Sequence, residues 1–186
     1  MHSHGLTSLL VGLILVGGCA RDPLVTNAIH AELVAPYRLD SGDQLRIVVF
    51  GQDDLSNTYV VDQSGSISMP LAGSVPARGR TTADVEASVT AALRNGFLRN
   101  PDVSVEVDRY RPFFAMGEVG LAGQYPYVPG MTLQQAIATA GGLTPRADLT
   151  SFQVTRSSGG QIETARLLLS DPIMPGDTIH VRGRHF

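Results

Sequence analysis

Apolar and polar residues alternate in several short segments of the first half of the chain. Residues 45–49 and 103–107 place leucine, isoleucine or valine at every second position, the period that predicts a β-strand with one buried face. Shorter runs at residues 59–61 and 67–69 predict two more strands, separated by a turn rich in aspartate, serine and glycine. Another cluster of turn residues, Asp40–Asp43, precedes the first strand.

The period changes to that of a helix after residue 80. Thr81 or Thr82 can accept the first free backbone amides as an N-cap, and Gly96 is placed to end the helix. Two prolines argue against a central strand at residues 71–73, between the short strands and this helix. One face of the predicted helix is apolar and carries Val85, Val89, Ala92 and Leu93.

The second half of the chain repeats this mixture of strands and one helix. Residues 114–119 and 125–128 predict two strands joined by a glycine-containing turn. Thr132 and Gln135 have the spacing of a capping box, which predicts a short helix that a glycine pair ends. Further strands are predicted near residues 152–156, 162–168 and 178–181. The chain is therefore expected to be α+β, with two small domains of short strands and one main helix in each.

The segment Arg109–Pro112 is interpreted as the joint between the two halves. Ser41–Ile47 and Pro175–Val181 echo each other, because each places glycine and aspartate before an alternating strand. This match is too short to establish a duplication, but it places one strand in each domain.

The chain begins with an apolar segment that ends at its only cysteine, Cys19. Residues 6–16 reach only about half of a ~30 Å hydrocarbon core at about 1.5 Å per residue, which predicts the hydrophobic part of a signal peptide. Residues 15–19, LVGGC, resemble the bacterial lipoprotein box. The resemblance implies a lipoprotein signal peptide over residues 1–19, cleavage before Cys19, and an N-palmitoyl, S-diacylglycerol cysteine there. The alternative is a chance cysteine in a plain signal or anchor segment.

Residues 20–36 are expected to form a tether between the lipid and the folded part. Because each buried methylene contributes roughly 0.8 kcal/mol, two or three acyl chains on one residue would anchor the protein stably. Ala20 and Arg21 follow the cysteine, so the aspartate that tends to retain lipoproteins on the inner membrane is missing. We therefore expect an outer-membrane location, lipid-anchored and facing the periplasm of a Gram-negative bacterium.

Charge and residue usage exclude several classes of function. The chain has a net charge of −3 without a basic block, which argues against nucleic acid as a partner. All 14 basic residues are arginines, so a Schiff-base lysine and a GxxxxGK phosphate loop are both excluded. A single cysteine excludes an internal disulfide and a cysteine-rich metal site.

The acidic residues form no convincing catalytic pair. Asp53 and Asp54 are adjacent, and adjacent side chains on a strand point to opposite faces, so a solvated turn is the preferred interpretation. Asp102, Glu106 and Asp108 are expected to face solvent, the alternative being the wall of a channel. Glycoside hydrolysis needs two positioned carboxylates, and covalent catalysis needs an activated nucleophile. No enzymatic activity, catalytic residue or cofactor is therefore expected.

Histidines and tyrosines offer two further candidates. His180 and His185 lie near the end of the chain without a third ligand nearby in sequence, so they are interpreted as surface residues and no metal site is expected. Tyr125 and Tyr127 could stack on sugar rings, but their spacing of two favours packing on one face of a sheet.

Several longer segments together resemble a known family. YRLDSGDQLRI, DQSGSISMPLAGSV and RNPDVSVEV resemble the N-terminal domain of bacterial outer-membrane polysaccharide export proteins, here residues 37–109. GEVGLAGQYPYVPGMTLQQAIATAGGLTPRAD and PGDTIHV resemble the soluble-ligand-binding (SLBB) β-grasp domain that follows it there, here residues 112–184. The segments occur in the order of the family and cover roughly residues 36–184. One small departure is Ala122, where the family usually has a proline.

The resemblance implies a periplasmic, outer-membrane lipoprotein that forms a homo-oligomeric ring and conducts a capsular polysaccharide or exopolysaccharide across the envelope. The best-known members continue into a C-terminal amphipathic helix that builds the membrane pore, and no such stretch follows residue 181 here. The expected partners are therefore the polymer, an inner-membrane polysaccharide co-polymerase and a separate outer-membrane β-barrel. The alternative function is a glycan-binding periplasmic lipoprotein without a transport role.

Overall fold

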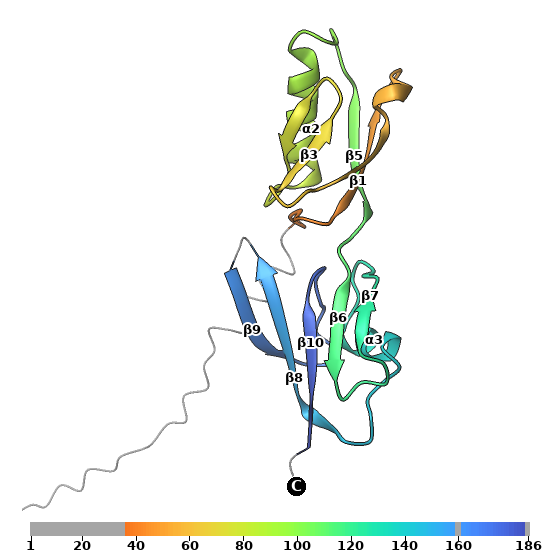
Figure 1. Cartoon of the computed structure of the whole chain (residues 1–186), viewed down its shortest axis with the longest axis vertical. Helices are drawn as coiled ribbons and strands as arrows, with labels where there is room; N and C mark the ends of the chain where they lie inside the picture. Colours follow the sequence, from red (N-terminus) through yellow and green to blue (C-terminus); the bar gives the residue numbers. More distant parts are fainter. Residues whose placement is uncertain (1–35, 159–160, 185–186) are drawn as a thin grey trace, which may run out of the picture.

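The computed structural model describes residues 36–158 and 161–184, which form two small bodies arranged along the long axis of the molecule (Figure 1). Each body has a hydrophobic core of its own, one containing Leu45 and the other Phe113. The predicted signal peptide, its Cys19 and the tether up to residue 35 lie outside the described residues.

The first body contains an antiparallel sheet with the strand order β2-β1-β5 and a separate hairpin, β3-β4. Helix α2 lies beside the hairpin and the sheet (Figure 1). Its elements are β1 (Gln44–Val49), the 3₁₀ turn η1 (Asp53–Leu55), β2 (Asn57–Val60), β3 (Ser66–Met69), β4 (Gly73–Pro76), α2 (Thr82–Arg94) and β5 (Val103–Arg109).

The alternation in β1 and the helical period in α2 together build the first core. Leu45, Ile47 and Val49 are buried on one face of β1, and Val85 and Leu93 of α2 are buried with them. The predicted helix start is confirmed, because the Thr81 hydroxyl accepts the Asp84 amide (3.2 Å) while the Asp84 carboxylate accepts the Thr81 amide (3.0 Å).

The second body is a mixed five-stranded sheet with the order β7-β6-β10-β8-β9. β10 runs parallel to β6, and the other pairs are antiparallel. Its elements are β6 (Phe113–Gly117), β7 (Gly123–Tyr125), α3 (Leu133–Thr139), β8 (Ala147–Ser158), β9 (Gln161–Leu167) and β10 (Thr178–Gly183). Alternate strand residues and the buried side of α3 form its core, including Phe113, Phe152, Ile179 and Leu133.

The α+β fold with two small domains, the second β-grasp-like, is confirmed. Within the described residues each body holds one α-helix, as the sequence predicts. The capping box at Thr132 is also confirmed, since its hydroxyl accepts the Gln135 amide (3.3 Å) and the Gln135 side chain accepts the Thr132 amide (2.9 Å).

The structure differs from the predicted strands at β7 and at β4. β7 ends at Tyr125 instead of continuing to residue 128, because Pro126 has no amide to donate to the ladder. The sequence does not predict β4, because its prolines argue against a central strand, and Pro76 lies at the end of β4. This proline is tolerated because β4 pairs only with β3, so one of its edges needs no donor.

Candidate functional site

The joint between the two bodies is centred on Arg111, the middle residue of the segment that links β5 to β6. Its Nη1 donates to Asp40 Oδ2 at 2.8 Å, and its backbone amide donates to Asp43 Oδ1 at 3.0 Å. Its Nε lies 3.6 Å from the same Asp43 oxygen, an ion-pair distance that is too long for a hydrogen bond. The arginine side chain also lies against Gly42 of the first body and Gly176 of the second. Arg111 therefore contacts turns from both bodies.

Three tyrosine rings also pack against one another at this joint. The ring of Tyr110 meets that of Tyr37 edge to face with centroids 5.1 Å apart, and it meets Tyr127 in the same way at 5.6 Å. The Tyr37 hydroxyl donates to Asp43 Oδ2 at 2.7 Å. Burial, followed by the negative charge of Asp43, raises the pKa of Tyr37 far above its usual range. The tyrosine therefore remains a neutral donor at neutral pH.

A second buried acid, Asp177, lies in the turn before β10. Its two carboxylate oxygens accept Nε and Nη2 of Arg156, each at 2.8 Å, and the whole carboxylate is buried. A bidentate pair of this kind fixes both side chains in one geometry. It holds the turn before β10 against β8, so its role is to position the strands of the second sheet.

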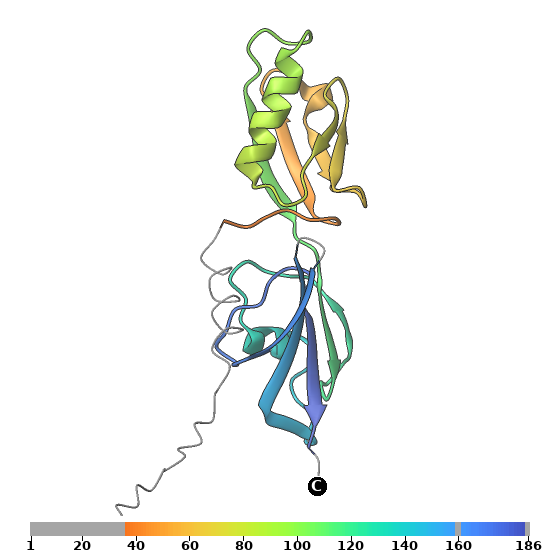
Figure 2. The same cartoon turned by 90° about the vertical axis from the view of Figure 1, so that its left-hand side faces the viewer.

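One face of the second sheet is covered by α3, and the other carries no described element, so we name it the open face (Figure 2). Two neighbouring rows of side chains cross it. The first row contains Phe114, Thr178, Thr155 and Thr164, and the second contains Met116, His180, Gln153 and Arg166. Arg182 belongs to the same face, and its Nε donates to Gln153 Oε1 at 3.2 Å.

The open face combines apolar surface with hydrogen-bonding groups. Phe114 and Met116 are 38% and 43% exposed, although both belong to a strand whose other face is in the core. The hydroxyls of Thr155 and Thr164 are hydrogen-bonded across two strands at 3.0 Å. Aromatic and apolar side chains can cover sugar rings, while amide and hydroxyl groups exchange hydrogen bonds with hydroxyls. Such a surface can form many shallow contacts with a ligand rather than one deep site.

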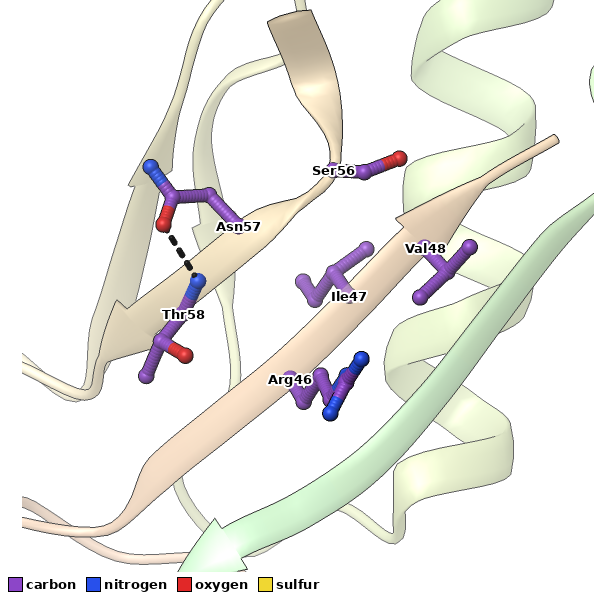
Figure 3. A pocket seen from close by; sticks show the side chains of 6 residues that line it. All are labelled: Arg46, Ile47, Val48, Ser56, Asn57 and Thr58. Carbon is purple, nitrogen blue, oxygen red and sulfur yellow. Dashed lines mark hydrogen bonds between the residues drawn. The ribbon is translucent and has the colours of Figure 1, made fainter. Parts of the chain in front are cut away.

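The first sheet also has a face that α2 does not cover, and a small pocket lies on it (Figure 3). The pocket has a volume of about 220 Å³ and lies between β1 and β2. It is lined by Arg46, Ile47, Val48, Ser56, Asn57 and Thr58. Its volume is below the roughly 300 Å³ at which small-molecule sites begin. The pocket therefore gives no support for a small-molecule cofactor.

The acidic candidates of the sequence lie at exposed positions of the first body. Asp53 and Asp54 are exposed in the first turn of η1, in agreement with a solvated turn. Asp102, Glu106 and Asp108 are exposed at or along β5, an exposure that fits both solvent and the wall of a channel. Within the described ranges, no group of three or more histidine, cysteine, aspartate or glutamate side chains is arranged to hold a metal ion.

The tyrosine interpretation is confirmed for packing. The Tyr125 ring stacks on Phe113 at 5.6 Å and its hydroxyl donates to the Leu121 carbonyl, while Tyr127 packs against the second core and Tyr110. His180 is exposed in the middle of the open face, and His185 lies outside the described residues. The sequence reasoning missed Phe114 and Met116 as exposed surface. It also missed the role of Arg111.

The described part of the chain contains no helix with the length and apolar content needed to span a membrane.

Comparison with known proteins identifies both bodies. Residues 31–108 match the family model of the polysaccharide biosynthesis/export protein, and residues 116–164 match that of the SLBB domain. These two ranges cover most of the first body and more than half of the second, in the order that the sequence segments predict.

Curated relatives agree with this assignment. The chain is 37% identical over 124 residues to the exopolysaccharide production protein ExoF of Rhizobium meliloti, an alignment that covers 60% of this chain and 29% of ExoF. It is 30% identical over 184 residues to the EPS I polysaccharide export outer membrane protein EpsA of Ralstonia solanacearum, covering 80% of this chain and 48% of EpsA. It is 25% identical over 140 residues to the polysialic acid transport protein KpsD of Escherichia coli, covering 74% and 24%.

The chain therefore spans less than half the length of these relatives. The similarity nevertheless extends over both bodies, and the two matched domains follow each other as they do in the sequence resemblance. With its export domain followed by an SLBB domain, the chain belongs to the polysaccharide biosynthesis/export protein family.

Proposed function

We propose that this chain is a lipid-anchored component of a channel that exports a capsular polysaccharide or an exopolysaccharide. The observation that carries the proposal is the tandem of an export domain and an SLBB domain, in a chain similar over 80% of its length to a named outer membrane export protein. In this proposal the protein faces the periplasm, forms a homo-oligomeric ring, and works above an inner-membrane co-polymerase.

The surfaces of the folded part are consistent with conduction rather than catalysis. A polymer in transit has to be released at every step, so many replaceable hydrogen bonds serve it better than one deep pocket. The open face offers hydroxyl, amide and guanidinium groups on a nearly regular cross-strand grid. Neighbouring strands are about 4.8 Å apart, so successive contacts can be exchanged over short distances.

The test is deletion of the gene, followed by measurement of polymer outside the cell and polymer retained inside. Export function predicts that secretion is lost and is restored by the wild-type gene. Unchanged secretion would contradict it and favour a glycan-binding protein without a transport role. The ring is tested separately, by native mass spectrometry of the purified protein. A protein that stays monomeric at every concentration would contradict the ring.

The lipid anchor is tested with Cys19→Ser. Acylation on Cys19 predicts that the wild-type protein is found with outer membranes and has a mass increased by its acyl groups, whereas the variant lacks this increase. Because the variant has no thiol to accept an acyl chain, it should be missing from the outer-membrane fraction. An unmodified Cys19 in the wild-type protein, with the signal segment still attached, would refute lipidation.

A further inference from the structure

The open face of the second sheet has an uneven charge. Arg166 and Arg182 are both exposed on it, and both lie next to Gln153: Arg166 is its cross-strand partner, and Arg182 donates to its side chain. Within the described residues, neither guanidinium has a carboxylate oxygen within 4.0 Å. His180 lies in the same row as Gln153 and Arg166.

The carboxylates near this face do not neutralise it. Glu163 belongs to β9, but its cross-strand partner is the buried Arg156, which places Glu163 on the other face of the sheet. Asp148 lies close enough to Arg166 and Arg182 for their charges to lower its pKa, although the main causes are hydrogen bonds from Thr150. Two arginines and one carboxylate leave the open face positive.

The corresponding face of the first sheet is different. There the exposed Arg46 is the direct cross-strand partner of Glu106, so opposite charges lie side by side. The carboxylate on the neighbouring strand offsets part of the attraction of Arg46 for an external anion. The positive charge of the open face is therefore a local property of the second body. The chain as a whole has a net charge of −3.

We propose that the open face of the second sheet binds an anionic polysaccharide, with Arg166 and Arg182 taking the carboxylate groups of acidic sugars. Phe114 and Met116, at the other side of the same rows, cover the apolar faces of the sugar rings. The threonine hydroxyls and the Gln153 amide supply the exchangeable hydrogen bonds between them. This inference rests on the proposed function, because it takes the exported polysaccharide to be the ligand of the open face.

Arginine suits this role because its planar fork of donors matches a carboxylate. Contacts of exposed charges are individually weak, and they can be broken and remade as a chain moves. An acidic polymer would therefore be attracted to the open face without being fixed at one position along it. A neutral polymer would gain only the ring and hydroxyl contacts.

The test uses affinity electrophoresis of the purified full chain in native gels that contain polygalacturonate, a polyuronate, or dextran, a neutral glucan. The test variant is Arg166→Gln combined with Arg182→Gln. The matched control is Arg94→Gln combined with Arg99→Gln, which removes the same charge from exposed positions of the first body. Circular dichroism checks that both variants are folded.

The proposal predicts that polygalacturonate retards the wild-type protein and the control more strongly than dextran does. The apparent affinity of the test variant for polygalacturonate should fall by about three- to thirtyfold, as two weak charge contacts are lost. Equal losses in both variants, an unchanged test variant, or equal retardation by dextran would each overturn it. If gene deletion stops secretion while the test variant binds polygalacturonate like wild type, the export function stands and this inference fails.

Discussion

Asp43 and Asp177 have equivalent structural positions in the two domains. Each is fully buried, follows a glycine with positive φ (+96° and +85°), and directly precedes a core strand. Each carboxylate accepts the backbone amide three residues earlier, from Asp40 at 2.9 Å and from Met174 at 2.8 Å. A buried carboxylate is tolerated only when its hydrogen bonds are satisfied, so both turns depend on these acids.

Asp177→Asn should destabilise the second domain strongly. Asparagine has no charge and places an N–H group where the carboxylate now accepts Arg156 or the Met174 amide, so two donors would face each other in a buried space. Removing one partner of a buried ion pair typically costs about 3–5 kcal/mol. Urea unfolding followed by circular dichroism measures the loss. The exposed Asp54→Asn is the control and should change little; a loss below about 1 kcal/mol for Asp177→Asn would contradict the argument.

The sequence predicted the local structure around these acids but not their partners. The Gly-Asp echo placed both turns correctly, because glycine and aspartate act locally on the backbone. Arg111 lies 68 residues from Asp43 and Arg156 lies 21 residues from Asp177, and the periodicity of the sequence does not indicate such distant contacts. Burial of the two carboxylates depends on these distant cations. It could therefore be recognised only in the folded chain.

The sequence does not predict the exposed residues of the open face, for a different reason. In the segment from Phe113 to Met116 every residue is apolar, so alternation does not tell which side faces the core. The structure buries Phe113 and Ala115 and exposes Phe114 and Met116. The sequence offers Tyr125 and Tyr127 as aromatic residues that could contact a sugar, yet both pack against other rings. Only the register of β6 with β10 decides which aromatic residue is available to a ligand.

Gly117→Ala should be much more damaging than Gly73→Ala. Both glycines have positive φ, +84° and +72°, so alanine is strained at either position by roughly 1–2 kcal/mol. A Cβ atom at position 117 would also lie 2.0 Å from the Val181 carbonyl oxygen, whereas nothing lies within 4 Å of one at position 73. The neighbouring atom is backbone of the central strand β10, which cannot move without disturbing the ladder. Thermal unfolding compares the two variants, and equal losses would show that the contact is harmless.

Tyr37→Phe should make unfolding less sensitive to alkaline pH. Burial, and then Asp43, raise the pKa of Tyr37 in the folded protein, whereas in the unfolded chain it titrates near its usual value of about 10. Above that pH the unfolded state loses the proton and the folded state keeps it, so wild-type stability falls as pH rises. Near neutral pH the variant loses only one hydrogen bond, about 1 kcal/mol. Urea unfolding at several pH values measures both slopes, and parallel slopes above about pH 10 would contradict the assignment.

Arg111→Gln should loosen the joint between the domains while leaving each core intact. Glutamine cannot reach Asp40 and Asp43 together, and it withdraws a cation from two acids that lie 2.8 and 3.6 Å from the guanidinium. The neighbouring Tyr110 would then become accessible to chymotrypsin more often. Cleavage there should be faster by about tenfold, the effect of roughly 1.4 kcal/mol on local opening.

The exposed Arg109→Gln removes the same charge nearby and should be cleaved like wild type. Equal cleavage rates in all three proteins would mean that the aromatic contacts of Tyr110, rather than Arg111, fix the joint.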